Sequence, residues 1–316
     1  MTATSGYRAG AETSLMQVAY VQESVYGVTP SPAVAFKQLR LTSESLTGRE
    51  TRQRPNELNG RREASSSGTM ERSAGGDIGF VLSYGTFDDW LSGLFGGEWT
   101  ADVLKPSDVF KSFLIEKRFA ANQLLSYPGC FIGGASLTMA RGQFLSGTFN
   151  IMAKDEVKGV ATLSTGAYTP APLGRVMDPV TGVKDVMMDG QAIAAVCNTI
   201  TLNITNEGAS QDFGLGFESA QGMRMGLFTG GGSAEFYFRD FTVYDRARSR
   251  MQGPLSFRTV DSDGNAYKWE IPNAVLTDPQ ITAGGPSQPI MARFNLEPNP
   301  HPTDGTMRVT RQPAAG

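Results

Sequence analysis

The sequence predicts a mainly β protein made of two similar β-sandwich or barrel-like units in tandem, each with one flanking α-helix. The first observation is an internal repeat, here termed the echo: GGDIGFVLSYGTFDDW, residues 75–90, aligns without a gap with GGSAEFYFRDFTVYDR, residues 231–246. A second pair of anchors keeps the same order, since Tyr127-Pro128 and TFNI (148–151) correspond to Ile271-Pro272 and RFNL (293–296). A repeat of about half the chain is too long for a solenoid, so it indicates two fused domains.

Alternating apolar and polar residues predict the strands. Residues 36–41 (FKQLRL) and 198–204 (NTITLNI) have the period of two of a half-buried strand, and each opens its unit. Turn-forming residues separate further β-rich runs at 112–119, 131–139, 144–153, 255–260, 266–271 and 289–296. Residues 141–142 and 261–265 resemble hairpin turns, so antiparallel pairing is expected.

One helix is expected in each unit. The first has a single apolar face, an N-cap at Thr86, acidic residues in its first turn and a glycine stop: Phe87, Asp88, Asp89, Trp90, Leu91, Leu94, Phe95, Gly96 and Gly97. The second is expected to begin near Asp240 and to carry Arg246, Arg248 and Arg250 in its last turn, where the helix dipole favours cations.

Composition narrows the function classes. The chain has 316 residues, 40% hydrophobic residues, 37 glycines and a formal net charge of −3, which favours a β protein and gives no sign of a nucleic-acid clamp. The sequence has neither an apolar run long enough to span a membrane nor the apolar core of a signal peptide, so folding in a cytoplasm is expected. Cys130 and Cys197 are expected to be buried thiols, with a disulfide between them as the alternative.

The sequence lacks the motifs of common catalytic and metal-binding sites. His301 is the only histidine and lies in a proline-rich segment, so no Ser-His-Asp, Cys-His or zinc site is predicted. The acidic turn at 261–265 lacks the spacing of a calcium loop, and Asp88-Asp89 are explained by the helix start. We therefore predict no enzyme, no metal and no cofactor.

A long polar segment, residues 48–74, allows two interpretations. It contains six arginines and four glutamates: Arg49, Arg52, Arg54, Arg61, Arg62, Arg72, Glu50, Glu57, Glu63 and Glu71. Its low hydrophobicity fits a disordered loop. The alternative is an arm that becomes ordered against another subunit, with the arginines pairing with carboxylates at a subunit or ring interface. The counterpart, residues 208–230, has fewer charges and more glycine.

Strand and glycine patterns recur in segments that together cover most of the chain: YPGCFIGGASLTM (127–139), GQFLSGTFNI (142–151), GQAIAAVCNTITLNITN (190–206), residues 223–240, GNAYKWEIP (264–272) and ESVYGVTP (23–30). In these segments the sequence resembles the major tail tube proteins of long-tailed, siphovirus-type bacteriophages.

The resemblance implies a structural virion protein, made in the host bacterial cytoplasm, whose inner strands form a β-barrel across subunits. Stacked rings would conduct DNA, and the partners would be further copies, the tail terminator, baseplate and tape-measure proteins, and the genomic DNA in transit. Because six tube units complete a ring in the family, two units per chain imply trimers, with hexamers as the alternative. The inner strands are expected at 36–46, 77–84, 199–206 and 233–240, with lumen-facing candidates Lys37, Thr42, Asp77, Ser83, Thr201, Asn203 and Glu235.

The expected organisation is an N-terminal arm (1–34), a first tube unit (35–158), a linker (159–189), a second tube unit (190–300) and a flexible tail (301–316). Two other readings remain open. One is a related tube or baseplate ring protein. The other is a carbohydrate-binding tandem β-sandwich that would offer Trp90, Trp99 and Trp269 to sugars.

Overall fold

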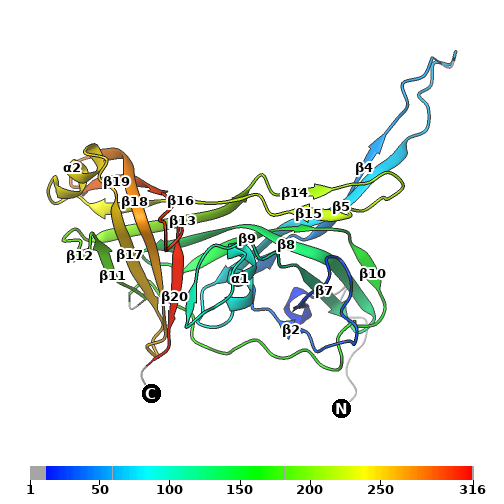
Figure 1. Ribbon diagram of the computed structural model, residues 1–316, viewed down its shortest axis with the longest axis horizontal. Helices are drawn as coiled ribbons and strands as arrows, with labels where there is room; N and C mark the ends of the chain where they lie inside the picture. Colours follow the sequence, from blue (N-terminus) through cyan, green and yellow to red (C-terminus); the bar gives the residue numbers. More distant parts are fainter. Residues whose placement is uncertain (1–11, 59, 181, 315–316) are drawn as a thin grey trace.

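The computed structural model describes residues 12–58, 60–180 and 182–314, and it is mainly β, as predicted (Figure 1). The first half contains η1 (Thr13–Leu15), β1 (Gln17–Gln22), β2 (Lys37–Gln38), β3 (Ser43–Glu44), β4 (Thr47–Gln53), β5 (Gly68–Val81), α1 (Asp88–Phe95), β6 (Val103–Leu104), β7 (Phe113–Ala120), β8 (Gln123–Ala140), β9 (Ser146–Ala153) and β10 (Val157–Gly159). The second half contains β11 (Val183–Met188), β12 (Gln191–Ala192), β13 (Cys197–Glu207), β14 (Ser210–Asp212), β15 (Gly222–Arg224), β16 (Leu227–Tyr237), α2 (Thr242–Arg248), β17 (Gly253–Val260), β18 (Ala266–Ala283), β19 (Ile290–Pro298) and β20 (Arg308–Gln312).

One antiparallel sheet of 18 strands runs through both halves, and β14 and β15 form a separate hairpin. The barrel-like alternative for each unit is wrong, because the described strands form one sheet that is not closed into a barrel. The reason is the length of β8 and β18. Each has 18 residues and passes through a β-bulge, so one strand continues from one layer into the next.

In the first half, β5 pairs with β4 and β9, and β9 pairs with the C-terminal half of β8. The N-terminal half of β8 pairs instead with β7 and β10, and β7 pairs with β1. In the second half, β16 pairs with β13 and β19, and β19 pairs with the C-terminal half of β18. The N-terminal half of β18 pairs with β17 and β20, and β17 pairs with β11. The pairing of β8 with β13 joins the two halves.

The core lies between these layers, and α1 fills its centre in the first half. Trp90 is fully buried, with its ring centroid 5.6 Å from Tyr20 and 5.2 Å from Phe149. Gly96 ends α1 in the left-handed conformation (φ 58°), as predicted. The predicted cap is wrong: Thr86 bonds to Ser83 by its hydroxyl, and Phe87 occupies the N-cap without a side-chain bond.

α2 begins at Thr242, close to the predicted start, and Oδ1 of Asp240 accepts a hydrogen bond from the Thr242 amide at 2.9 Å. Arg250 lies beyond the helix end, at a φ of 53°. The predicted hairpin turn at 261–265 is also present, since Oδ1 of Asp261 accepts the amides of Asp263 and Asn265.

Several segments differ from their predicted form because they pair with strands distant in the sequence. Residues 37–38 alone form a strand in the predicted run 36–41, and 308–312 form β20 where a flexible tail was expected. Within the expected N-terminal arm, β1 pairs with β7. Within residues 48–74, β4 and β5 form a hairpin, so the interpretation as a disordered loop is wrong for the paired residues 48–53 and 68–74. Cys130 and Cys197 are free thiols, and the disulfide alternative is therefore wrong.

Candidate functional site

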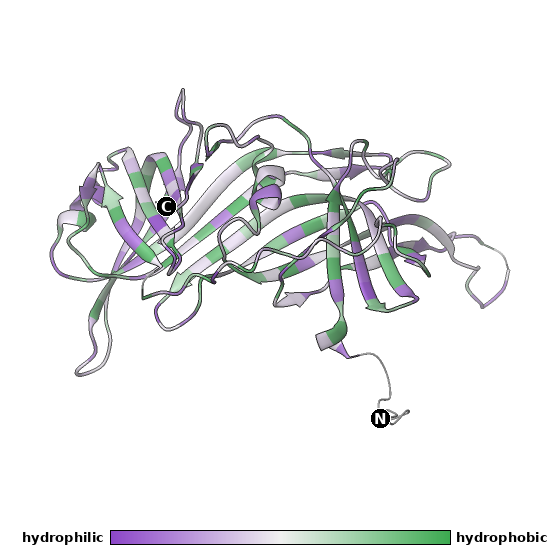
Figure 2. Ribbon diagram, turned by 90° about the horizontal axis from the view of Figure 1, so that it is seen from below, coloured by the Kyte–Doolittle hydropathy of each residue, from purple (hydrophilic) through white to green (hydrophobic). Residues whose placement is uncertain are grey.

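The part of the sheet formed by β5, β9, β8, β13, β16 and β19 has one polar face. Along β13, Ile200, Leu202 and Ile204 are buried, whereas Thr201 and Asn203 point to the other side of the strand and remain partly or fully exposed. The same alternation of hydrophobic and hydrophilic residues is visible along the strands in Figure 2. We use the name polar face for the side of β5, β8, β9, β13, β16 and β19 that carries Thr201 and Asn203.

Strand register aligns small polar side chains into rows across this face. The longest row crosses six strands, from β9 to β18, and contains Ser146, Thr138, Thr201, Ser233, Asn295 and Thr277. A second row contains Thr148, Ser136, Asn203 and Gly231. Short hydroxyl and amide side chains hydrogen-bond to water without a fixed charge. The rows therefore give this face neutral side chains that can hydrogen-bond to water.

Four of the predicted lumen-facing residues lie on the polar face: Asp77, Thr201, Asn203 and Glu235. The two acidic side chains have amide partners. Nδ2 of Asn150 donates to Oδ1 of Asp77 at 3.0 Å, and Nδ2 of Asn198 donates to Oε1 of Glu235 at 2.7 Å. Arg293 lies opposite Glu235 on β19. Positive and negative groups are thus interspersed on this face.

The other three predicted residues have different surroundings. Ser83 is fully buried and bonded to Thr86, so it cannot line a surface. Lys37 lies on β2, which pairs with β1, and its Nζ contacts Oδ2 of Asp89 at 2.6 Å. Thr42 is exposed beside β5, where its amide donates to the carbonyl of Gly79 at 2.8 Å.

The prediction missed the polar residues of β8 and β9. Ser136, Thr138, Thr148 and Asn150 belong to the same rows as the predicted residues. Their signal was present in the alternation of ASLTMA (135–140) and SGTFNI (146–151). Strand pairing brings them beside β13, which the sequence pattern does not specify.

The β4–β5 hairpin projects from one end of the sheet (Figure 1). We call residues 47–73 the arm. All residues of β4 are exposed. The interface candidates are distributed along the arm, with Arg49 and Arg52 on β4, Arg54, Arg61 and Arg62 in the connection, and Arg72 on β5.

Some of these arginines have partners within the chain. Nη1 of Arg52 donates to Oε1 of Glu50 at 2.8 Å, and its Nη2 donates to the carbonyl of Ser67 at 3.2 Å. The hydroxyl of Thr69, followed by Arg52, lowers the pKa of Glu50. Arg72 contacts Glu218 at 2.9 Å. Arg52 therefore connects residues within the arm, whereas Arg72 connects the arm to the second half of the chain.

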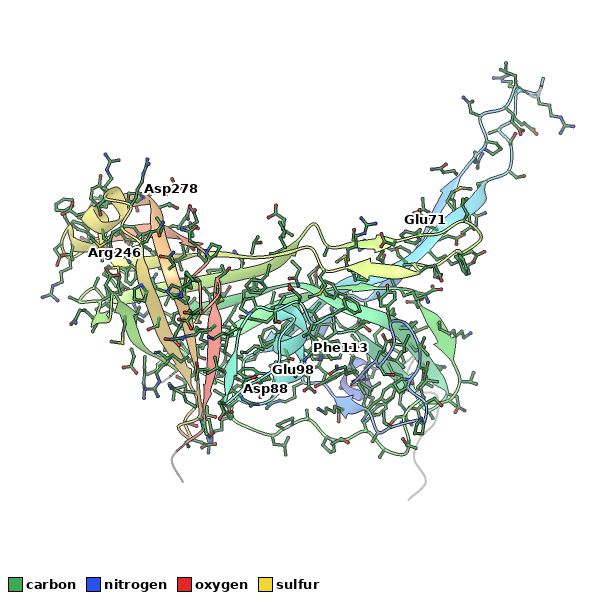
Figure 3. All side chains as sticks on the ribbon, in the orientation of Figure 1. Glu71, Asp88, Glu98, Phe113, Arg246 and Asp278 are labelled. Carbon is green, nitrogen blue, oxygen red and sulfur yellow. The ribbon has the colours of Figure 1, made fainter. Side chains whose placement is uncertain are left out.

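A segment from the second half supports the base of the arm. The amide of Arg72 donates to the carbonyl of Glu218 at 2.7 Å, and Nε2 of Gln211 donates to the carbonyl of Ala153 at 2.8 Å. In Figure 3, Glu71 lies at this end of the molecule, whereas Arg246 and Asp278 lie at the opposite end. Residues 208–230 thus lie along the first half of the chain.

The residues with catalytic or ligand-binding potential are engaged in local structure. Nδ1 of His301 accepts the amide of Asp304 at 3.3 Å. In the part of the chain that the structure describes, no group of three or more His, Cys, Asp and Glu residues is arranged to hold a metal ion. No helix among the described residues is long and apolar enough to cross a membrane.

The three tryptophans do not form a sugar-binding platform. Trp90 and Trp269 are buried, so neither presents a ring to solvent. Trp99 is stacked with Arg311, whose Cζ lies 4.4 Å from the ring centroid. The carbohydrate-binding alternative therefore loses the residues that suggested it.

Comparison with known proteins complements this geometry. The family model described as phage tail tube protein matches residues 13–298. No curated protein matches the chain.

Proposed function

The chain belongs to the phage tail tube protein family, and from this premise we propose that it is the repeating subunit of a tail tube through which DNA passes. The family match over residues 13–298 carries the proposal. In this role the protein is a structural component of the virion tail. It is made in the host cytoplasm and assembles with further copies and with terminator, baseplate and tape-measure proteins.

The polar face is the proposed wall of the channel. DNA that moves along a wall must not be held by it, and each phosphate contact with Lys or Arg releases counterions and strengthens binding. The row from Ser146 to Thr277 offers hydroxyl and amide groups, and the acidic Asp77 and Glu235 repel phosphates. Arg293 on the same face lies opposite Glu235, whose charge offsets its attraction for phosphate. These properties favour rapid transit over binding.

The two halves are proposed to be tandem tube units that arose by duplication. The echo aligns Asp77 with Ser233, and the second anchor aligns Asn150 with Asn295. Asp77 pairs with Asn150 in β5–β9, and Ser233 pairs with Asn295 in β16–β19. Agreement of residue register between the halves supports the duplication more strongly than a shared order of elements.

We propose wider bounds for the two units than the expected residues 35–158 and 190–300. The first unit would also include β1, from the expected N-terminal segment (1–34), because β1 pairs with β7. The second unit would also include β11 and β20, because they pair with β17 and β18. Residues 48–74 remain an appendage of the first unit.

Three chains per ring are proposed, because each chain contributes two units to a pseudo-sixfold barrel. Closing a sheet across subunits removes the exposed edges that would otherwise promote aggregation. The arm is proposed to reach a neighbouring subunit or the adjacent ring, because it projects beyond the sheet and exposes charged side chains.

Negative-stain electron microscopy of concentrated protein tests the proposal, together with the mass of the smallest ring by light scattering. Rings or tubes with a central channel and a mass of three chains are the expected result. Six chains per ring would replace the trimer by the hexamer, and short rings that never stack would favour a baseplate or terminal ring. A protein that stays monomeric under all conditions would contradict the tube function.

A further inference from the structure

We propose that the β18 edge of one copy pairs with the Ser43–Arg49 edge of the next copy, in the register that β8 and β13 adopt inside each chain. The inference rests on the proposed tube function and specifies its subunit contact. The partner is a second copy of this chain, and Thr47 of one copy is placed opposite Gln280 of the other.

Both edges are half-paired within the described part of the chain. β3 and β4 pair with β5 on one side, and residues 280–283 of β18 pair with β19 on one side. Ser43, Thr47 and Gln280 are exposed. A strand edge of this kind directs main-chain amides and carbonyls outward. On the Ser43–Arg49 edge, the amides of Leu46 and Gly48 donate to Oε2 of Glu44 at 3.1 Å and to Oε2 of Glu156 at 3.0 Å, and the Leu46 carbonyl accepts from Lys117 and Tyr127. Pairing with another copy therefore exchanges side-chain partners for main-chain partners. The two edges border the polar face at its opposite sides, since β3 and β4 adjoin β5 and β18 adjoins β19.

The equivalent edges in the middle of the molecule are paired with each other. β8 corresponds to β18, and β13 corresponds to the edge formed by β3 and β4, because each has the same neighbour in its own half. β8 and β13 join as an antiparallel pair from Thr199 opposite Ala140 to Thr205 opposite Gly134. The internal junction is therefore a template for the junction between copies.

Each side of the new pair follows from observed register. Asn203 lies opposite Gly231, and the equivalent of Gly231 is Gly75, which lies opposite Thr47. Asn203 thus corresponds to Thr47.

On the other strand, Ser136 lies opposite Thr148. The equivalent of Thr148 is Arg293, which lies opposite Gln280. Ser136 thus corresponds to Gln280. Since Asn203 and Ser136 are opposite each other in the chain, Thr47 and Gln280 are opposite each other across the subunit contact.

The adjacent pairs are chemically compatible in this register. Leu202 and Leu137, an apolar pair facing the core, become Leu46 and Ile281. Ile281 is partly buried against the core of its own chain. The polar and apolar sides of the two edges therefore match, whereas a shift of one residue would place Leu46 against the polar side.

A groove beside β18 supports the same occupant. In the first half, Asn206 of β13 fills the space between α1 and β8, and its Nδ2 donates to the carbonyls of Leu94 and Ile132 at 3.1 and 3.2 Å. In the second half, a groove of about 800 Å³ lies between the end of α2 and β18. Its lining includes Arg248 and Arg250 at the α2 end and the acidic Asp278 and Glu297 on β18 and β19.

The residue that would enter this groove is acidic and can pair with its two arginines. Asn206 lies opposite Phe228, the equivalent of Arg72, and Arg72 lies opposite Glu50. The register therefore directs Glu50 of one copy toward Arg248 and Arg250 of the next. In the single chain Glu50 is bonded to Arg52 and Thr69 on the exposed arm, so assembly exchanges these contacts.

Disulfide trapping tests the register. Thr47→Cys and Gln280→Cys are combined in a Cys197→Ser background, rings are isolated, and a mild oxidant is added. Directly opposed residues have Cα atoms about 4.5–5.5 Å apart, within the range that a disulfide can bridge, whereas diagonal neighbours lie about 7–8 Å apart. Covalently linked dimers and trimers on a non-reducing gel are expected, at least tenfold more than for either single-cysteine variant.

Thr47→Cys with Thr282→Cys is the matched control, because it moves one cysteine two residues along the same face. Cross-linking of this control in preference to the first pair, in well-formed rings, would overturn the register and leave the tube function intact. Failure of the parent protein to form rings under the same conditions would instead overturn the tube function.

A charge exchange tests the groove separately. Glu50→Arg should reduce the fraction of protein in rings at low salt, and adding Arg248→Glu and Arg250→Glu should restore it. Glu50→Arg that assembles as well as the parent, or a triple variant that is no better than Glu50→Arg, would overturn the placement of Glu50.

Discussion

Arg246 of α2 and Asp189, in the turn between β11 and β12, form a two-pronged ion pair. Nε and Nη2 of Arg246 donate to Oδ2 and Oδ1 of Asp189, each at 2.8 Å. The guanidinium is 5% exposed, whereas the carboxylate is 38% exposed. Gly253 permits this approach, because a Cβ there would clash with Oδ1 of Asp189. The pair therefore holds α2 against the turn between β11 and β12.

Asp189→Asn is expected to destabilise the protein by about 2 kcal/mol, because it leaves a buried guanidinium without its counter-charge. The value lies below the 3–5 kcal/mol typical of fully buried pairs, since the carboxylate is partly solvated. Asp185→Asn is the control. It has a similar positive φ and an Arg258 partner, but a more exposed pair, and should cost less than about 1 kcal/mol. Urea unfolding of the unassembled subunit measures both, and equal effects would contradict the special role of Arg246.

The same pair predicts a pH dependence. Hydrogen bonding to Arg246 lowers the pKa of Asp189 from its ordinary value of 3.8. A carboxyl with a lowered pKa in the folded state contributes stability that is present above its ordinary pKa and is lost as the pH falls through the folded pKa. The difference in unfolding free energy between the parent and Asp189→Asn should therefore be constant from pH 7 to 5 and shrink below about pH 4. A difference that grows on acidification would refute this linkage.

Gly147→Ala is expected to destabilise the first half by about 1–3 kcal/mol through overpacking. A Cβ at Gly147 would collide with the carbonyl oxygen of Ser136 and lie 2.5 Å from Cζ of Phe80. Phe80 is already stacked on Phe149 with a centroid distance of 4.5 Å. Gly159→Ala, where the nearest atom to the new Cβ is 3.6 Å away, is the control and should be nearly neutral in thermal unfolding. Equal melting temperatures for the two variants would count against close packing at Gly147.

Thiol labelling of assembled tubes is expected to distinguish a channel wall from an outer surface. Thr201→Cys in a Cys197→Ser background should react with a small maleimide and resist a bulky polymer-linked one, because the polar face is proposed to line the lumen. The remaining Cys130 should stay silent, since burial raises the pKa of its thiol well above the ordinary value. Arg61→Cys on the arm is the comparison site, and fast reaction of Thr201→Cys with the bulky reagent would place the polar face outside.

Replacement of Arg49, Arg52, Arg54, Arg61 and Arg62 by Ser is expected to weaken stacking of rings and to leave the core folded. All five lie on the exposed β4 strand or its connection, so the loss falls on contacts between copies. The deficit should be largest at low salt and shrink as salt rises, because salt also screens the arginine pairs of the parent. Sedimentation of tubes measures stacking, and melting of the unassembled subunit measures the fold. The matching Lys variant retains the charge but lacks the bidentate geometry of Arg, so recovery by Lys would indicate simple charge attraction.

The amino-acid sequence was sufficient for the features that depend on local pattern and spacing. Alternation in residues 198–204 and 144–153 predicted β13 and β9, the apolar stripe and Gly96 predicted α1, and Asp261 predicted a turn. The echo between residues 75–90 and 231–246 aligned strands β5 and β16 before their neighbours were known. Each of these signals lies within one element or one turn, where backbone geometry imposes the period.

Features that depend on partners far along the chain came from the tertiary structure. Alternation indicates that Thr201 and Thr138 lie on one side of their strands, but only pairing of β13 with β8 brings them side by side. Ser83 is of a residue type that is common on surfaces, yet it is fully buried. Lys37, predicted to face the lumen, lies beside Asp89. Strand pairing joins residues many positions apart through backbone hydrogen bonds that every residue type can make, so side-chain pattern specifies the face of a strand and long-range packing selects its neighbour.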